Sequence, residues 1–273
     1  MSSANVSYKK SSFGPAFFFL SKRRRAALAA YYEFCRRVDD IVDEPSDNDP
    51  FKQLDFWQAE VERIFNHTAT TELGKELTQV VDEFGLTPDR FLLLIEGMRA
   101  DLQGRTYDTL RALEWYLYRV AVIVGLATLD IMDVKGPQAE ALAKALGGAV
   151  QLTNIIRDVP ADANLGRVYL PQTLLTRYRV SREDVLAGRQ PKRTARVLVQ
   201  LHKTACRLYA AANVQMNRLP RLKMLPCRMI ACVYAKNLAK IKKTGFVFVQ
   251  PIKLTKTEKV IGAFHALLKT LVG

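Results

Sequence analysis

Apolar residues recur at three- and four-residue spacing along most of the chain, which is the period of helices that bury one face. Clusters of turn residues at 45–50, 85–88 and 136–137 separate these periodic segments. The segments predicted to be helical are residues 22–44, 50–66, 71–84, 88–102, 109–132, 137–157, 193–216, 222–242 and 257–271. The best candidate for a strand, 246–249, is short and isolated. The pattern therefore predicts an all-α fold with a single domain over residues 1–273.

The composition supports one globular unit. Of the 273 residues, 49% are hydrophobic and 25% are charged, which is typical of a folded protein and not of a disordered one. The sequence contains no Ser/Gly linker and no internal repeat. Lys and Arg number 41 against 27 Asp and Glu, which gives a net charge of +14. So basic a chain is expected to bind a nucleic acid, an anionic membrane surface or a phosphorylated substrate.

The four cysteines and three histidines are scattered without ligand spacing. This argues against a zinc cluster or a disulfide framework and favours a reducing compartment such as the cytoplasm. The longest charge-free apolar run, 120–129, is shorter than the roughly 20 residues that span a bilayer. We therefore expect any membrane contact to be peripheral, on the inner face of the membrane.

Two basic segments with interspersed apolar residues, 22–25 and 218–228, indicate where such contact would occur. Each cation near an anionic bilayer contributes about 1 kcal/mol. The alternative of nucleic-acid binding has no zinc finger, RNP pattern or helix-turn-helix signature to support it, so no nucleic acid is expected as a partner. A third interpretation is that the charge serves solubility alone.

The first candidate chemistry is a pair of carboxylates, Asp39 and Asp43, near the end of the first predicted helix. Their four-residue spacing puts both on one helix face, about one turn apart. Asp40 and Glu44 repeat the spacing, and close acids repel each other by roughly 1 kcal/mol per pair in water. A helix C-terminus is also unfavourable for negative charge. A hard divalent cation, which prefers oxygen ligands, would compensate this charge.

A second pair, Asp158 and Asp162, repeats the four-residue spacing near the end of another apolar helix. Gln151, Asn154 and Asp158 fall on one face, which predicts a polar stripe facing a cavity. Pro160 interrupts this turn, so the predicted helix stops before it.

Either acidic run alone is typical of a solvated surface whose carboxylates pair with nearby Arg36, Arg37 and Arg157. Two such runs, each ending a long apolar helix beside arginine, favour a second interpretation. Two facing carboxylate pairs could hold Mg²⁺ ions, and the ions could hold a diphosphate. The arginines would then contact phosphate oxygens directly.

Four motifs in this order resemble the squalene/phytoene synthase family, the head-to-head trans-isoprenyl diphosphate synthases. They are FCRRVDDIVDE at 34–44, YLYRVAVIVG at 116–125, QLTNIIRDVPAD at 151–162 and GRVYLP at 166–171. The resemblance covers nearly the whole chain. It implies an isoprenoid synthase helical bundle around a central apolar cavity, which uses Mg²⁺ and prenyl diphosphates.

Within the family, segments 11–13, 96–101 and 118–121 look most like hopanoid-type presqualene diphosphate synthases. That branch joins two farnesyl diphosphates for squalene and hopanoid biosynthesis, and a downstream pathway enzyme removes the second diphosphate. The alternatives are a phytoene synthase with a C20 substrate, a dehydrosqualene synthase, a one-step squalene synthase that reduces with NADPH, and a membrane-associated scaffold of the pathway. Both acidic pairs are intact, which argues against the scaffold, because a scaffold has no need for facing carboxylates. One interpretation of Glu96 and Asp101 is that they face solvent.

The resemblance also implies roles for individual side chains. The implied ligands of Mg²⁺ are Asp39, Asp43, Asp158, Asp162 and Asn154. Tyr32 and Tyr116 are catalytic candidates at the cavity mouth, and the alternative for both is ordinary helix packing. The substrate-binding candidates are Ser12, Phe13, Arg36, Gln151, Asn154, Arg157, Arg167, Tyr169 and Tyr234. For Arg167 and Tyr169 the alternative is a brace of the local loop.

Two positions depart from the family pattern. Many members carry a basic residue where this chain has Gln and Pro at 250–251, and Lys253, Lys256 or Lys259 could substitute for it. Lys10 stands where relatives usually carry a small polar residue beside the substrate, and it could supply phosphate-binding charge.

Overall fold

The structure is a computed structural model that describes residues 19–44 and 47–272. Over these residues every regular element is helical, so the predicted all-α fold is confirmed. The α-helices are α2 (Lys22–Asp43), α3 (Pro50–Phe65), α4 (Glu72–Phe84), α5 (Asp89–Leu102), α6 (Leu110–Leu117), α7 (Ile123–Ile131), α8 (Pro137–Asn164), α9 (Gln172–Arg177), α10 (Arg182–Leu186), α11 (Pro191–Asn217), α12 (Leu225–Lys243) and α13 (Lys256–Val272). A π-helix, η2 (Tyr118–Val122), joins α6 to α7.

Local chemistry explains many of the helix ends. The side chain of Thr71 accepts a hydrogen bond from the backbone of Gly74 and so begins α4. Gly85 ends α4 in the left-handed conformation that glycine adopts without strain. The helices α3 and α8 both begin with proline. Proline has no backbone N–H, and this costs nothing in a first turn, where an N–H group would have no acceptor within the helix.

Three local predictions were wrong. Residues 246–249 form no strand, because Phe246 has a φ of 61° and belongs to the turn that follows α12. The short helices α9 and α10 lie in a stretch where the sequence predicted none. Helix α8 continues through Pro160 to Asn164, and the N–H of Arg167 closes its end by donating to the carbonyl of Asp162 at 2.8 Å.

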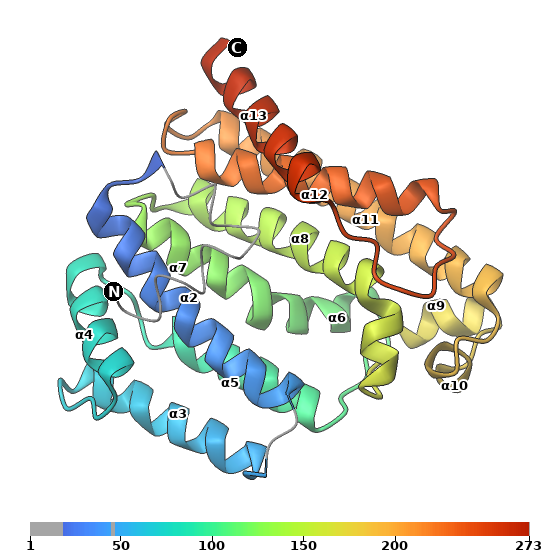
Figure 1. Cartoon of the computed structure of the whole chain (residues 1–273), viewed down its shortest axis with the longest axis horizontal. Helices are drawn as coiled ribbons and strands as arrows, with labels where there is room; N and C mark the ends of the chain where they lie inside the picture. The colour runs from blue at the N-terminus through green and yellow to red at the C-terminus, as the bar shows by residue number, and fades with distance from the viewer. Residues whose placement is uncertain (1–18, 45–46, 273) are drawn as a thin grey trace.

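Figure 1 shows α8 running through the middle of the bundle, with α2 and α5 on one side and α11 and α12 on the other. The pair α3 and α4 lies outside α2 and α5 (Figure 1). The first half of α8 packs in one apolar cluster with α2, α5 and α12, and its second half packs in another with α6, α9 and α11. One long helix therefore supports both parts of the core.

The π-helix η2 lies unusually close to its neighbours. A Cβ atom on Gly147 of α8 would come within 2.9 Å of the Cα of Val122, and one on Gly97 of α5 would come within 2.7 Å of a methyl group of Val120. Gly147 therefore requires glycine because its neighbours are backbone atoms, whereas at Gly97 an added Cβ would force the Val120 side chain to shift. The extra residue of a π-turn shifts the helix register locally, and such turns are frequent at functional sites.

Among the described residues, one helical run, Leu110–Ile131, is long and apolar enough to cross a membrane by length and composition. This run consists of α6, η2 and α7, which pack against α5 and α8. These contacts bury part of the run, as in a core helix.

Candidate active site

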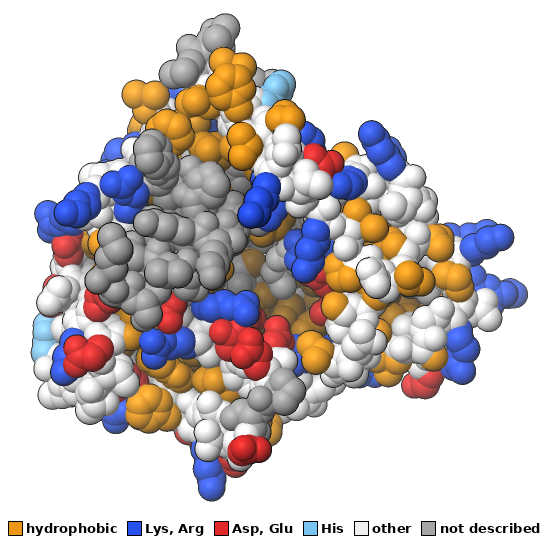
Figure 2. All heavy atoms as spheres, in the orientation of Figure 1, with side chains coloured by type: hydrophobic (Ala, Val, Ile, Leu, Met, Phe, Trp, Pro, Cys, Tyr) orange, Lys and Arg blue, Asp and Glu red, His pale blue; other side chains and the backbone are white. Residues whose placement is uncertain are grey.

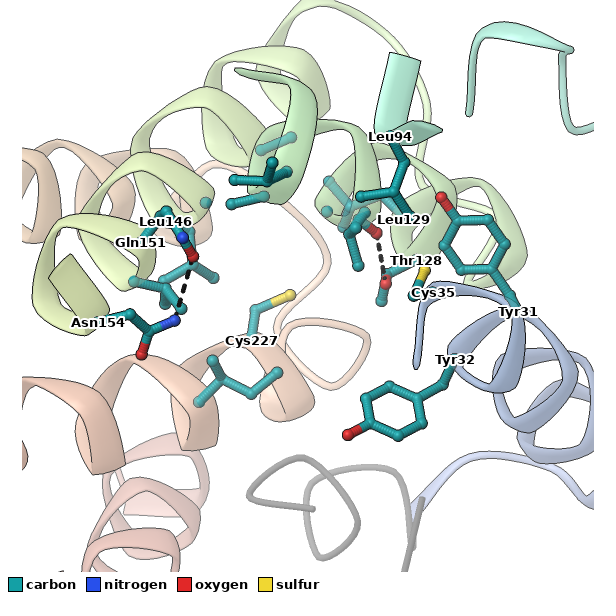
Figure 3. Close-up of a pocket in the computed structure, with 18 of the residues that line it drawn as sticks. Tyr31, Tyr32, Cys35, Leu94, Thr128, Leu129, Leu146, Gln151, Asn154 and Cys227 are labelled. Atoms are coloured by element: carbon teal, nitrogen blue, oxygen red, sulfur yellow. Dashed lines mark hydrogen bonds between the residues drawn. The ribbon is translucent and has the colours of Figure 1, made fainter. Parts of the chain in front are cut away.

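A cavity of about 310 Å³ lies between α2, η2, α7, α8 and α12. Figure 3 shows Tyr31 and Tyr32 projecting from α2 on one side and Gln151 and Asn154 from α8 on the other. Most of its lining is apolar, and examples are Leu28, Leu94, Val124, Leu129, Leu142 and Leu146. Its volume and lining are typical of a site for a small organic ligand.

The charged and amide side chains of the lining lie at one end of this cavity. Leu28 and Leu142 come early in α2 and α8, whereas Asp39 and Asn154 come late in the same two helices. Eleven helical residues separate Leu28 from Asp39, which corresponds to about 16 Å along the helix axis. The cavity is therefore elongated, with an apolar end and a polar end.

The two acidic helix ends lie on the same side of the molecule. Arg167, which follows α8, binds Asp43 of α2 with 2.5 Å between its Nη1 and Oδ1, and its Nη2 donates to the carbonyl of Val42 at 2.6 Å. The backbone of the same arginine is bonded to Asp162. One residue thus joins the carboxyl end of α2 to that of α8.

The carboxylates at this end perturb one another. Burial, and then the charge of Asp43, raise the pKa of Asp39 to about 6, although Arg36 opposes the shift. Burial, and then the charge of Asp158, raise the pKa of Asp162 to about 8. A positive charge between α2 and α8 would relieve this repulsion.

Arginines already partner several of these acids. Arg36 reaches Asp39 at 3.2 Å and Asp40 at 2.6 Å. Arg157 binds both oxygens of Asp158, with 2.8 Å between Nε and Oδ1. The sequence suggested that these acids pair with nearby arginines, and the structure contains these pairs. Two of the paired residues, Arg36 and Asp39, also line the cavity.

No group of three or more Asp, Glu, His or Cys side chains among the described residues is arranged to enclose a metal ion. Mg²⁺ does not require such a group, because it is usually held by one or two carboxylates together with water and substrate phosphates. Asn154 supplies a further observation: its Nδ2 donates to Gln151 at 3.1 Å, while its buried Oδ1 has no hydrogen-bond partner. An unpaired amide oxygen beside carboxylates with raised pKa fits a hard cation.

A tyrosine pair surrounds a buried acid that sequence reasoning left open. The hydroxyls of Tyr116 and Tyr169 donate to the two carboxylate oxygens of Asp101 at 2.8 and 2.9 Å, and the two rings stack at 4.9 Å. Asp101 is only 9% exposed, and burial raises its pKa to about 6. The interpretation that it faces solvent was wrong, whereas Glu96 is exposed.

The spacing of α5 contained a signal for this burial. Leu94, Met98 and Asp101 follow one another at four and three residues, so they share a helix face, and the first two line the cavity. An acid on an apolar face is expected to have buried partners.

The structure separates the candidates into two groups. Those that line the cavity are Tyr32, Arg36, Asp39, Tyr116, Gln151, Asn154 and Tyr234. Those that lie outside its lining, on or beside the joined helix ends, are Asp43, Arg157, Asp158, Asp162, Arg167 and Tyr169. Ser12, Phe13 and Lys10 lie outside the described residues. Lys253, Lys256 and Lys259 do not appear in the lining of this cavity.

The chain is similar to known proteins over most of its length. The family model for squalene/phytoene synthase matches residues 6–258. Phytoene synthase 2, chloroplastic, of Solanum lycopersicum is 34% identical over 91% of this chain and 83% of its own length. Several other plant phytoene synthases are longer, and the chain spans 57–63% of their length.

Two solved structures share the fold closely. The crystal structure of squalene synthase HpnC from Alicyclobacillus acidocaldarius superposes with a TM-score of 0.82 at 27% identity, and the match covers 91% of this chain and 92% of that one. A dehydrosqualene synthase in complex with ligand superposes with a TM-score of 0.86, also at 27% identity, over 99% of this chain and 95% of that one.

Proposed function

The chain belongs to the squalene/phytoene synthase family, whose members are prenyltransferases, and from this premise we propose that it joins two farnesyl diphosphates head to head into presqualene diphosphate. One observation carries the proposal. An elongated apolar cavity ends at carboxylates and arginines from two helices, and Arg167 joins those helices. The cavity suits an isoprenoid chain, and its polar end suits a diphosphate.

The arginines beside the joined helix ends would hold the departing diphosphate. Arg36 lines the cavity, and Arg157 and Arg167 lie at the carboxyl end of α8. A guanidinium binds two phosphate oxygens at once and remains charged at every relevant pH. These residues would therefore hold the diphosphate at the polar end of the cavity while the allylic C–O bond breaks.

Mg²⁺ would be held by the carboxylates Asp39, Asp43, Asp158 and Asp162 together with the unpaired amide oxygen of Asn154. When bound, Mg²⁺ withdraws electron density from the diphosphate and so assists its departure. The carboxylates of this chain supply hard oxygen ligands and the negative charge that retains such an ion.

The rest of the cavity would protect the allylic cation from water. When the C–O bond breaks, its electron pair leaves with diphosphate, and the double bond of the second chain supplies the electrons for the new C–C bond. Loss of one proton, to the released diphosphate or to a nearby tyrosine, then closes the cyclopropane ring. The apolar lining excludes water, and the ring faces of Tyr32, Tyr116 and Tyr234 attract positive charge by about 0.5–2 kcal/mol each.

The hydrogen bond from Tyr116 to Asp101 would keep its ring in place at the cavity wall. Tyr169 stacks on that ring and bonds the same carboxylate. The buried acid thus acts on the site through two aromatic side chains, as a positioning residue.

The structural and the sequence comparisons favour different lengths of the substrate. The structural similarity to a squalene synthase and a dehydrosqualene synthase over more than 90% of both chains favours the farnesyl substrate. The second candidate is a phytoene synthase with the C20 substrate, because sequence relatives at 31–36% identity carry that name.

Incubation of the purified chain with Mg²⁺ and farnesyl diphosphate, with and without NADPH, tests the proposal. We expect release of one diphosphate per product and a product that retains the other diphosphate whether or not NADPH is present. A parallel incubation with geranylgeranyl diphosphate separates the second candidate by product mass. Absence of released diphosphate with both substrates would contradict the proposed function.

A further inference from the structure

The C-terminal helix α13 is apolar on two opposite faces. One face, with Ala263 and Ala266, is buried in the core cluster that includes α12. On the other face, Val260, Phe264 and Leu268 are 63, 57 and 44% exposed, and the adjacent Ile261 is 54% exposed. We call these four exposed residues the α13 stripe. Four large apolar side chains exposed together on one helix form a hydrophobic patch, so the stripe is a surface without a partner among the described residues.

Basic residues border the first turn of α13. Lys253 and Lys256 are exposed. Lys240 of α12 binds Glu258 at 2.8 Å, which neutralises the acid closest to the stripe. Figure 2 shows hydrophobic side chains over this end of the molecule with Lys and Arg along their border.

Two further basic segments lie at the same end. Figure 1 places the start of α2 and the turn before α12 at the end that carries α13. Lys223 of that turn binds Asp133 at 3.0 Å, and Arg24 of α2 also acts on Asp133 electrostatically, so the two segments are neighbours. Each segment adds an exposed apolar residue, since Phe19 is 51% and Leu222 is 72% exposed.

This end is opposite in charge to the candidate active site. Helix α2 begins with the basic run 22–25 and ends at the acidic run 39–44, and its 22 residues correspond to about 33 Å. The charge on α2 is thus polarised along the length of the helix. An anionic surface would attract the basic end and repel the acidic one, which fixes an orientation.

We propose that this end docks peripherally on an anionic lipid bilayer, with the α13 stripe inserted among the lipid headgroups. Exposed apolar side chains bordered by cations are the arrangement that binds such an interface, through apolar burial together with attraction to anionic lipid. A second copy of this chain is a poorer occupant, because a symmetric contact would bring the same basic segments against each other. The proposal does not depend on the reaction that the chain catalyses.

Flotation of the full chain with lipid vesicles tests the proposal without any substrate. The vesicles contain either equal parts of phosphatidylglycerol and phosphatidylcholine or phosphatidylcholine alone. The stripe variant is Phe264→Gln, and its matched control is Phe51→Gln, a residue that is 40% exposed. Phe51 belongs to α3, a helix that lies far from α13 (Figure 1). The charge variant is Lys256→Gln, with the exposed Lys192→Gln of α11 as its control.

The wild-type chain is expected to float with the anionic vesicles and not with the neutral ones. Phe264→Gln should weaken binding about tenfold and Lys256→Gln about fivefold, with both controls unchanged. Equal binding to the two vesicle types, or unchanged binding by Phe264→Gln, would overturn the proposal. So would light scattering that shows a wild-type dimer in the absence of lipid that Phe264→Gln dissociates.

Discussion

Arg167 and Asp43 form an ion pair although 124 residues separate them in the chain. The second nitrogen of the guanidinium donates to the carbonyl of Val42, so the arginine holds the last turn of α2 at two points. Because its own backbone is bonded to Asp162, it fixes the distance between the two acidic helix ends. A diphosphate site shared between α2 and α8 depends on that distance.

Replacing this arginine should therefore impair both stability and turnover. Arg167→Gln removes the ion pair and is expected to lower the free energy of unfolding by roughly 1–3 kcal/mol and kcat/KM by about 100-fold or more. Arg167→Lys keeps the charge but lacks the two separate nitrogens with which Arg167 reaches Asp43 and the carbonyl of Val42, so its activity should fall between that of the wild type and that of Arg167→Gln. Urea unfolding and diphosphate release measure these effects.

The matched control is Arg189→Gln, which removes an ion pair to Asp184 on the surface near α10. Exposed ion pairs contribute little, so we expect neither stability nor turnover to change. If Arg167→Gln behaved like this control, the ion pair would not be what positions the two helix ends.

The acidic pairs themselves should be needed for turnover but not for folding. Asp39→Asn or Asp158→Asn is expected to reduce diphosphate release by about 1000-fold or more, since each removes one of the charged oxygen ligands proposed for Mg²⁺. Circular dichroism should show unchanged helix content in both variants. Glu44→Gln, which changes an exposed acid at the end of the same helix, is the control and should retain activity. Normal turnover in both Asp variants would disprove the assignment of these carboxylates.

The raised pKa of Asp162 predicts that its replacement increases stability, whereas replacement of Arg167 decreases it. With its folded-state pKa near 8 instead of the ordinary 3.8, the folded protein keeps a proton there that the unfolded chain loses. The stability that depends on this proton is complete below about pH 4 and is lost as the pH rises towards 8. Asp162→Asn cannot ionise and should avoid this loss.

At pH 8 we therefore expect Asp162→Asn to be more stable than wild type by roughly 2–5 kcal/mol in the absence of Mg²⁺, and at pH 4 to be equal to it. Urea unfolding at both pH values is the measurement. Glu140→Gln, at the exposed start of the same helix, should show no such pH-dependent gain. A variant less stable than wild type at pH 8 would mean that the Asp162 carboxylate is favourably paired.

Most helices could be predicted because apolar periodicity and turn residues are local signals. The continuation of α8 past Pro160 could not, since the N–H of Arg167 that closes its end belongs to the following loop. The kinds of residue in the site could be predicted, because the acidic pairs and their arginines are adjacent in sequence. The burial of Asp101 was harder to predict, because it depends on Tyr169, which lies 68 residues away.

The last prediction concerns two neighbouring glycines on α8 that differ in what surrounds them. A Cβ atom on Gly147 would lie 2.9 Å from the Cα of Val122 and 3.0 Å from the carbonyl oxygen of Ala121, both backbone atoms of η2. A Cβ atom on Gly148 would instead meet one methyl group of Leu208 at 3.2 Å, and a side chain can move. Alanine also favours a helix over glycine by roughly 0.5–1 kcal/mol.

Gly147→Ala should therefore push η2 away from α8 and lower the free energy of unfolding by about 1–3 kcal/mol, whereas Gly148→Ala should be neutral or slightly stabilising. Because Gly147 and Ala121 both line the cavity, the first variant should also raise KM for the prenyl diphosphate, and the second should not. Urea unfolding and steady-state kinetics on the two variants measure both effects. Equal behaviour of the two would show that the bundle can relax around η2, and that the close contact between η2 and α8 does not determine the shape of the cavity.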